Sequence, residues 1–407
     1  MKLAVYQLIY EIYPLIIIFL LYFLNYLSLK AIILLYICYC IYNRLTSTVK
    51  VNYASTNSTI NQIINKCPSI LKPNYKPHFL LSNSILQLLT LDYTVNYIYP
   101  KEYTEETKYV PIGDSGIKVI YYSYKEISTY EHQPIFMFFP GLTGNHTERY
   151  SRNIIHEAIL NGFRVIVYQM RMLCPCEQIN FSNKDKECYN YFEDVAITMN
   201  YLNAKHPNVD FYGIGCSFGA LQLTGYLGSE YNKENKYFKA AVSVSNPYDM
   251  LTSSRICRGS IYDTFLLTVI RKNFVKNFIN CNKVFKVHKV DVNKVLTCEE
   301  SRDFDNEFTR KILGCAHTDD YYRNISVSDK IKNISIPILF IHAMDDNITT
   351  EKAIPYDDIY NNSNCVSIWV QRGAHLCFIE QGKNIFELKQ WMTTPVVEFI
   401  KSASQVL

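Results

Sequence analysis

The sequence predicts an α/β fold, in which a mostly parallel central sheet is flanked by helices. Short runs rich in β-branched and aromatic residues alternate along the chain with segments of helix length. Several of the short runs are almost continuously apolar, as expected of strands that are covered on both faces. Strands and helices that alternate in this way are typical of parallel sheets with right-handed crossover connections.

The first element is an apolar segment within residues 1–50. Residues 12–29 carry no charge, and a second apolar run covers residues 31–42 after Lys30. A membrane-spanning helix needs about 20 apolar residues, which the first run nearly supplies and the second does not. We therefore expect one transmembrane anchor here. The alternatives are a tight membrane hairpin of both runs or a buried hairpin of a soluble domain. A cleaved signal peptide fits less well, because the apolar region of a signal peptide is shorter than this one.

Charges around this segment predict its orientation. Three basic residues lie between the first run and residue 50, whereas Lys2 alone precedes the run. The positive-inside tendency then places the C-terminal part on the cytosolic side of the endoplasmic reticulum or another endomembrane. Glycosylation sequons at Asn145 and Asn347 agree with this side, because a glycan there would obstruct the residues that we identify below as the candidate active site.

Beyond the anchor, residues 51–407 are expected to form one large α/β domain. Its predicted strands are Ile117–Tyr124, Pro134–Phe139, Phe163–Tyr168, Val209–Gly215, Lys239–Val244, Ile336–Ile341 and Val366–Val370. The interval between the fifth and sixth of these, about 90 residues without a clear strand, is much longer than a usual connection of a few residues. Its apolar periodicity predicts a helical insertion at about 248–330, covering the carboxyl edge of the sheet as a lid.

Composition argues against several classes of partner. The 41 basic and 37 acidic residues leave a net charge of +4, and no long basic run occurs, so nucleic acid is not an expected partner. Cys174-Pro175-Cys176 is not matched by a second ligand pair at zinc spacing, so no metal site is expected. We likewise expect no cofactor and no obligate protein partner.

The pattern G-x-S-x-G at residues 215–219 places Ser217 between a predicted strand and the helix-length segment FGALQLTGYL. This strand-turn-helix context is the one that a nucleophile elbow requires, and small residues at 215 and 219 let the helix approach the strand closely. The start of the helix also brings free backbone N–H groups and a positive dipole end near the serine oxygen. Ser217 is therefore the predicted nucleophile, and Cys216 is expected to be a small buried neighbour.

A serine hydroxyl is a poor nucleophile unless a base accepts its proton. His375 is the predicted base, because it lies in a glycine-containing loop just after the last predicted strand and completes the order serine, acid, histidine. Asp345 and Asp346 follow the preceding strand, and either could orient the imidazole. Asp346 is favoured because the acid of such a site usually lies about four residues past its strand, with Asp345 as the runner-up.

An oxyanion hole is the remaining requirement of this chemistry. One donor should be the backbone N–H of Phe218, the residue after the nucleophile. The other should come from the loop that reads FFPGLTGNHTERY, where Gly141 permits an unusual backbone and Leu142 is placed to present its N–H. Because backbone atoms would stabilise the oxyanion, the leucine side chain need not be polar.

These motifs, together with several others, resemble one family. The family is that of the membrane-anchored α/β-hydrolase-domain proteins, which include mammalian medium-chain phospholipid and monoacylglycerol lipases and fungal medium-chain ethyl-ester acyltransferases. The matching stretches run from about Pro134 to the C-terminus and include FPGLTGNHTERY, GCSFGALQLTGYLG, AAVSVSNPYDM, IPILFIHAMDDNITTEKAIP and RGAHLCFIE. The resemblance implies the α/β-hydrolase fold, with Ser217 as nucleophile, Asp346 as acid and His375 as base. An N-terminal membrane segment is also typical of the family.

The resemblance implies a lipid-directed activity. The leading expectation is a membrane-anchored serine hydrolase that cleaves carboxylic esters of lipids, acylglycerols or phospholipids, through an acyl-enzyme. One alternative is an acyltransferase that makes esters from medium-chain acyl thioesters and alcohols. The other is a catalytically silent hydrolase fold that serves as a membrane-bound scaffold. The chain departs from the family pattern near Arg171, where YQMRMLCPCEQ keeps the arginine but lacks the usual glycines.

Overall fold

A computed structural model describes residues 28–94, 103–112, 115–124, 133–171, 189, 191–233, 235–384 and 386–407. Most of the first apolar run and the Cys174–Cys176 stretch lie outside the described residues, so the expectations for them stay predictions.

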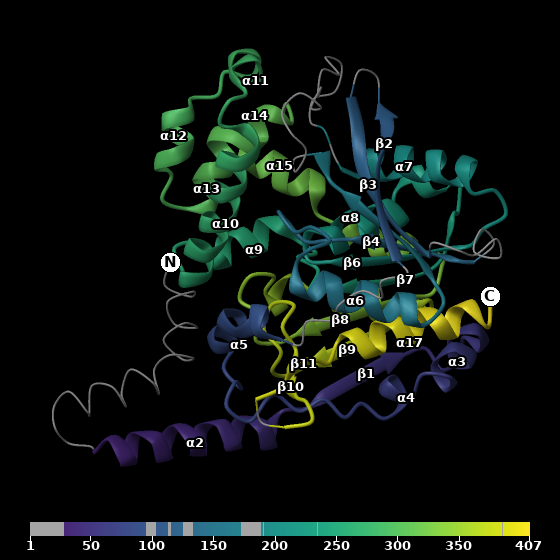
Figure 1. The fold of residues 1–407 in the computed structure, drawn as a ribbon, viewed down its shortest axis with the longest axis vertical. Helices are drawn as coiled ribbons and strands as arrows, with labels where there is room; N and C mark the ends of the chain where they lie inside the picture. The colour runs from purple at the N-terminus through teal and green to yellow at the C-terminus, as the bar shows by residue number, and fades with distance from the viewer. Residues whose placement is uncertain are drawn as a thin grey trace.

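A nine-stranded sheet forms the centre of the protein, in the order β1-β9-β8-β7-β6-β4-β5-β3-β2 (Figure 1). The strands are β1 (Val49–Tyr53), β2 (Tyr103–Ile112), β3 (Ser115–Tyr124), β4 (Ile135–Phe139), β5 (Arg164–Gln169), β6 (Phe211–Cys216), β7 (Phe238–Val244), β8 (Ile338–Ala343) and β9 (Cys365–Val370). The pairs between β5 and β9 in this order are parallel, and the outer pairs are antiparallel. The predicted α/β fold with a mostly parallel sheet is confirmed.

The seven predicted strands are present, with ends within two residues of the prediction. Two further strands of this sheet, β1 and β2, were not predicted, because each lies at an edge and has a partly exposed polar face. In β1 the half-buried Val49 and Val51 alternate with the exposed Lys50. Edge strands of this kind lack the continuous apolar run that marks a central strand.

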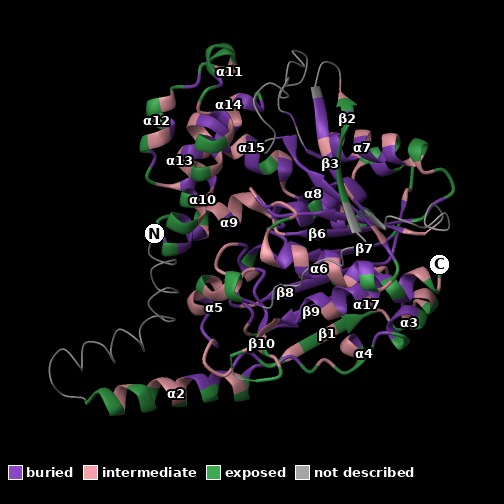
Figure 2. Ribbon diagram, in the orientation of Figure 1, coloured by how far each residue is buried: buried purple, intermediate pink, exposed green. Residues whose placement is uncertain are grey.

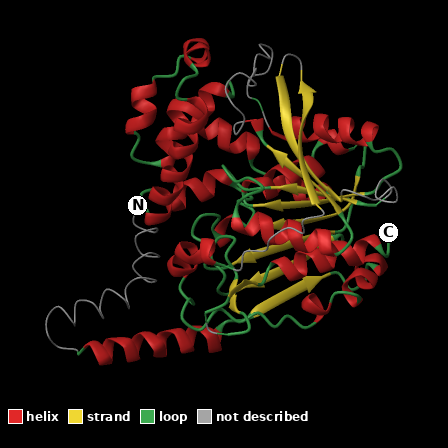
Figure 3. Cartoon of the chain, in the orientation of Figure 1, coloured by secondary structure: helices red, strands yellow, loops and turns green. Residues whose placement is uncertain are grey.

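Helices cover both faces of the sheet (Figure 3). One face packs against α7 (Tyr191–Lys205) and α8 (Phe218–Leu227), and the other against α3 (Ser58–Asn65), α6 (Arg149–Leu160) and α17 (Thr393–Ser404). Strand β4 serves both layers: Ile135, Met137 and Phe139 belong to the first core, and Phe136 and Phe138 to the second. Successive side chains of a strand point to opposite faces, which explains why this strand is apolar throughout.

The interval between β7 and β8 is helical. It contains α9 (Met250–Cys257), α10 (Ile261–Phe278), α11 (Asn282–His288), α12 (Val292–Thr297), α13 (Ser301–Phe304), a π-helical turn (Asp305–Thr309), α14 (Arg310–Ile312) and α15 (Thr318–Ile325). These helices gather beside the sheet (green in Figure 1) and have an aromatic centre, in which the ring of Phe274 contacts those of Phe278, Phe285 and Phe308. The helical character matches the expectation, while the role of a lid stays a prediction.

The second apolar run forms α2 (Leu29–Thr46), which projects along the lower edge of the protein (Figure 2). It is long and apolar enough to cross a membrane by length and composition, with a mean hydropathy of 1.3 over 18 residues of which 11% are buried. The first run, which the sequence favours as the anchor, lies almost wholly outside the described residues, so that expectation stays a prediction. Near its end, Arg44 Nη1 donates a hydrogen bond of 2.6 Å to the Pro77 carbonyl.

Candidate active site

Ser217 lies at the sharp turn between β6 and α8. Its backbone has φ 53° and ψ −121°, and its N–H donates to the carbonyl of Val244 at 2.8 Å. A positive φ is uncommon for a residue with a side chain, and such conformations concentrate at functional sites. The turn therefore presents the serine at the carboxyl end of the central strands, as the sequence motif predicts.

The two glycines of the motif are needed for space. A Cβ on Gly219 would lie 2.0 Å from the carbonyl oxygen of Phe139, and one on Gly215 would lie 2.5 Å from the Cα of Ala220. Both contacts are with backbone atoms, which cannot move aside as a flexible side chain would. The helix can approach the strand this closely only because neither position carries a side chain.

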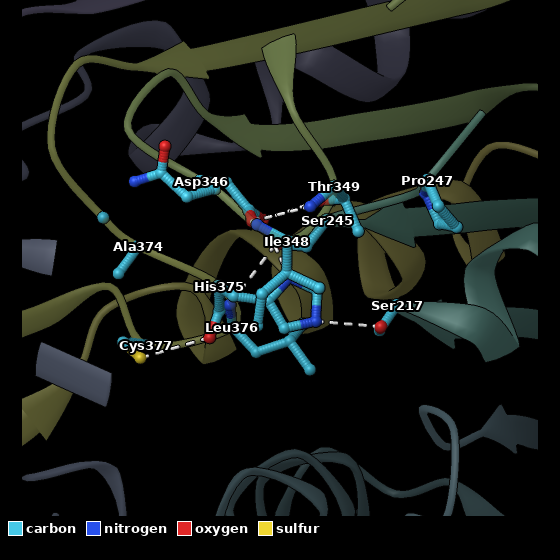
Figure 4. Close-up of polar contacts among 12 residues, drawn as sticks. Ser217, Ser245, Pro247, Asp346, Ile348, Thr349, Ala374, His375, Leu376 and Cys377 are labelled. Atoms are coloured by element: carbon cyan, nitrogen blue, oxygen red, sulfur yellow. Dashed lines mark hydrogen bonds and ion pairs between the residues drawn. The ribbon is translucent and has the colours of Figure 1, made fainter. Parts of the chain in front are cut away.

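The structure brings Ser217, His375 and Asp346 into one hydrogen-bonded row (Figure 4). His375 Nε2 lies 2.9 Å from Ser217 Oγ, and His375 Nδ1 lies 2.8 Å from Asp346 Oδ2. The histidine comes from the loop after β9 and the aspartate from the loop after β8. The side chain of His375 is 13% exposed and that of Asp346 is fully buried.

Asp346 stays ionised in this environment. Burial by itself would raise the pKa of its carboxyl, but the charge and hydrogen bond of His375 and the hydroxyl of Thr349 together hold that pKa well below its usual range. The backbone N–H groups of Ile348 and Thr349 each donate to Oδ1 at 2.9 Å, and the Thr349 hydroxyl donates to Oδ2 at 2.6 Å. An ionised, fixed carboxylate can hold one imidazole tautomer and stabilise an imidazolium.

Asp345 contacts the backbone that leads to the imidazole. Its Oδ1 accepts hydrogen bonds from the backbone N–H groups of Gly373, at 2.8 Å, and of Ala374, at 2.9 Å. Of the two aspartates that the sequence left in competition, Asp346 is therefore the one in contact with His375.

The candidate oxyanion loop passes directly against the nucleophile. A Cβ on Gly141 would lie 3.2 Å from Ser217 Cβ. The Gly141 N–H donates to the hydroxyl of Tyr150 at 2.9 Å, and Leu142 follows immediately. Phe218 is the first residue of α8, so its N–H lacks an acceptor within the helix. Leu142 and Phe218 thus lie on the two segments that flank Ser217.

Two hydroxyl groups that support the site were not identified from the sequence. Thr349 contacts Asp346, and Tyr150 contacts Gly141. Thr349 follows Asp346 by three residues, a spacing at which an aspartate often bonds its own turn, so a signal was present. Tyr150 lies on α6 and had no such signal.

Arg171, also named from the sequence, forms an ion pair with a residue outside this row. Arg171 is buried and pairs with Asp194 through two contacts, Nε to Oδ2 at 2.8 Å and Nη2 to Oδ1 at 2.7 Å. In the described part of the chain, no group of three or more histidine, cysteine, aspartate or glutamate side chains is arranged to hold a metal ion.

Comparison with known proteins gives several relatives, although no protein-family model matches the chain. Phospholipase ABHD3 of Homo sapiens is 27% identical over 259 residues, which cover 63% of this chain and 61% of the relative. The monoacylglycerol lipase of Saccharomyces cerevisiae is 28% identical over 331 residues, covering 77% and 70%. Medium-chain fatty acid ethyl ester synthase/esterase 2 of the same yeast is 23% identical over 300 residues, covering 67% and 63%.

The match spans about six tenths of the length of the phospholipase relatives. It covers 61% of the human protein and 60% of the Bos taurus protein of the same name. Among solved structures, Est1E from Butyrivibrio proteoclasticus aligns over 74% of this chain and 99% of its own, with a TM-score of 0.43 and 13% identity. The resemblance predicted from the motifs is confirmed: the chain is similar to α/β-hydrolase-domain lipases and esterases.

Proposed function

We propose that this chain is a membrane-anchored serine hydrolase that cleaves carboxylic esters of lipids, acylglycerols or phospholipids. The observation that carries the proposal is the row of hydrogen bonds from Ser217 Oγ through the imidazole of His375 to the carboxylate of Asp346, at 2.9 and 2.8 Å. Nucleophile and base within hydrogen-bond distance, with the base oriented by a third group, are the arrangement that activates a serine.

The proposed reaction begins when Ser217 Oγ attacks the ester carbonyl carbon and His375 Nε2 takes the hydroxyl proton. The negative charge that develops on the carbonyl oxygen would receive hydrogen bonds from the N–H groups of Leu142 and Phe218. Asp346 stabilises the imidazolium, which then protonates the leaving alcohol and leaves an acyl group on Ser217. Water, deprotonated by His375, attacks the acyl carbonyl and releases the carboxylic acid and the free serine.

A lipid substrate is supported by the names of the relatives, which include a phospholipase and a monoacylglycerol lipase, and by the exposed apolar helix α2. An anchor near the site would keep the enzyme at the bilayer, where apolar esters concentrate. We place the domain that follows α2 on the cytosolic side and give the helices at about 248–330 the role of a lid. Protease protection in sealed microsomes tests the side: a cytosolic domain is digested without detergent, and a lumenal one is protected.

The nucleophile is tested with a fluorophosphonate probe, which labels activated serines. The wild type and the control Ser229→Ala, which changes a serine at the far end of α8, should label equally, and Ser217→Ala should not label. Equal labelling of Ser217→Ala would refute the assignment. Lipid profiling by mass spectrometry, with purified wild type and Ser217→Ala acting on one mixed lipid extract, would then identify the ester that is consumed.

Acyl transfer to an alcohol is the second candidate, because one relative is named an ethyl ester synthase/esterase. The same acyl group on Ser217 would be transferred to an alcohol in place of water. A medium-chain acyl thioester supplied with ethanol separates the two: a hydrolase yields mainly free acid, and a transferase yields mainly ethyl ester. A silent scaffold would give neither product and no probe labelling.

A further inference from the structure

The loop that carries His375 has a strained backbone. Ala374, Leu376 and Phe378 have φ values of 51°, 60° and 44°, in the left-handed region that residues with side chains seldom adopt. Conformations of this kind persist only where surrounding contacts hold them. The position of the imidazole therefore depends on the groups that fix this loop.

Asp345 contacts the loop on the side that leads into His375. Its Oδ1 accepts the N–H of Gly373 at 2.8 Å and that of Ala374 at 2.9 Å, the two residues just before the histidine. Asp345 is only 6% exposed, so water competes little for these bonds. Hydrogen bonds to a carboxylate are roughly twice as strong as those between neutral groups.

The side of the loop that follows His375 has other supports. Gln390 Nε2 donates to the Leu376 carbonyl at 2.7 Å, and the Leu376 N–H donates to Ser245 Oγ at 3.4 Å. Among the described residues, Asp345 supplies the side-chain hydrogen bonds to the backbone N–H groups of residues 373 and 374. The side chains that hold the two sides of the loop thus differ, and a backbone bond of 2.7 Å from the Phe378 N–H to the Gly373 carbonyl joins the sides.

We propose that Asp345 is a positioning residue, whose carboxylate holds residues 373 and 374 so that the imidazole of His375 stays in line between Asp346 and Ser217. This inference rests on the proposed function of the same site. The two adjacent aspartates then have separate tasks: Asp346 contacts the imidazole, and Asp345 contacts the backbone that carries it. Because both follow β8, the acid and the loop of the base are fixed to one strand end.

The test compares Asp345→Ala with Asp345→Asn in the full-length protein, using a water-soluble p-nitrophenyl ester. Misplacement of a catalytic group by about 1 Å can cost roughly 100-fold in rate, so Asp345→Ala should lower kcat by about 10- to 100-fold with little change in KM. Fluorophosphonate labelling should slow in the same ratio. Asp345→Asn keeps an oxygen acceptor for both N–H groups, so its kcat should stay within about 5-fold of the wild type. A small decrease is expected because a neutral acceptor gives a weaker bond than a carboxylate.

Two results would overturn the inference. Wild-type kcat in Asp345→Ala would show that the loop holds His375 without this side chain. Equal losses in Asp345→Asn and Asp345→Ala would show that the charge acts, and not the hydrogen bonds to residues 373 and 374. If Asp345→Ala does not fold, Asp345→Glu takes its place: it keeps the charge but moves the carboxylate, so kcat should fall, and an unchanged kcat would contradict the proposal.

A double-mutant cycle with His375→Ala separates positioning from general damage to the fold. If Asp345 acts only through His375, Asp345→Ala should reduce the residual activity of His375→Ala no further. A second loss as large as that in the wild-type background would overturn the inference. Full activity of Ser217→Ala would refute the proposed function itself, whereas an inactive Ser217→Ala beside a fully active Asp345→Ala would refute the role of Asp345 alone.

Discussion

Replacing Asp346 by asparagine tests the electrostatics of the site with little change in shape. The asparagine oxygen can take the place of Oδ1 and accept the N–H groups of Ile348 and Thr349, now at 2.9 Å. Its amide nitrogen then lies where Oδ2 now accepts from the Thr349 hydroxyl and faces His375 Nδ1 at 2.8 Å. An amide nitrogen only donates, so Nδ1 would have to accept and Nε2 would carry the proton.

That tautomer cannot take the proton of Ser217, so the loss should be large. A serine hydrolase whose histidine is in the wrong tautomer loses about 10⁴-fold in kcat, and each factor of ten is about 1.4 kcal/mol of barrier. We therefore expect a decrease of about 10³- to 10⁴-fold in Asp346→Asn, or about 4–5.5 kcal/mol, measured with a water-soluble ester at saturating concentration.

Thr349→Val is the matched control for this substitution. It removes the 2.6 Å hydroxyl contact with Asp346 but leaves the carboxylate and its contact with His375. Loss of one hydrogen bond to a charged group corresponds to about 3 kcal/mol at most, so the control should be the more active variant by at least about fivefold. A decrease of less than tenfold in Asp346→Asn would refute the reasoning, because the imidazole would then not depend on the carboxylate.

Three further predictions concern pH, a buried ion pair and the candidate oxyanion loop. The pKa of the Asp346 carboxyl is lowered in the folded state, so its contribution to stability is present above its unfolded pKa of about 3.9 and is lost as the pH falls through the folded value. Urea unfolding at pH 6 and at pH 2 measures this. The free energy of unfolding should fall less between the two pH values in Asp346→Asn than in the wild type. Arg171→Ala leaves the buried Asp194 carboxylate without its positive partner, with only the Tyr189 hydroxyl among its named side-chain contacts, and should lower the free energy of unfolding by about 3–5 kcal/mol. An unchanged urea midpoint would contradict this expectation. Tyr150→Phe removes the acceptor of the Gly141 N–H. An unsatisfied buried donor costs about 1–3 kcal/mol, so kcat should fall by about 5- to 150-fold while KM changes little. A wild-type kcat would show that the loop keeps its position without that bond.

The central strands could be predicted from the sequence because both of their faces are buried. Phe136 and Phe138 pack on one layer and Met137 on the other, so the apolar run itself marks the strand. The edge strand β1 has no such run, because Lys50 faces solvent beside Val51. The extent of α2 could not be read from apolarity alone, since the apolar run ends at Tyr42 and the helix at Thr46.

The candidate site was predictable where residue order carries the information. Ser217 and His375 follow predicted strand ends in the order that the chemistry needs, and the structure brings them to 2.9 Å. The distinct contacts of Asp345 and Asp346 were not predictable with certainty, because adjacent side chains in a turn diverge according to its dihedral angles. The same holds for Tyr150, whose hydroxyl reaches Gly141 only through the packing of α6.

The connection between α2 and the sheet is short. Residues 47 and 48 alone separate the end of α2 at Thr46 from the start of β1 at Val49. Two residues span at most roughly 7 Å, so this connection is no flexible tether. If α2 is the anchor that we propose, Ser217 would keep a nearly constant height above the bilayer. The proposed hydrolase would then draw on the lipids directly beneath it and depend on their lateral diffusion for its supply.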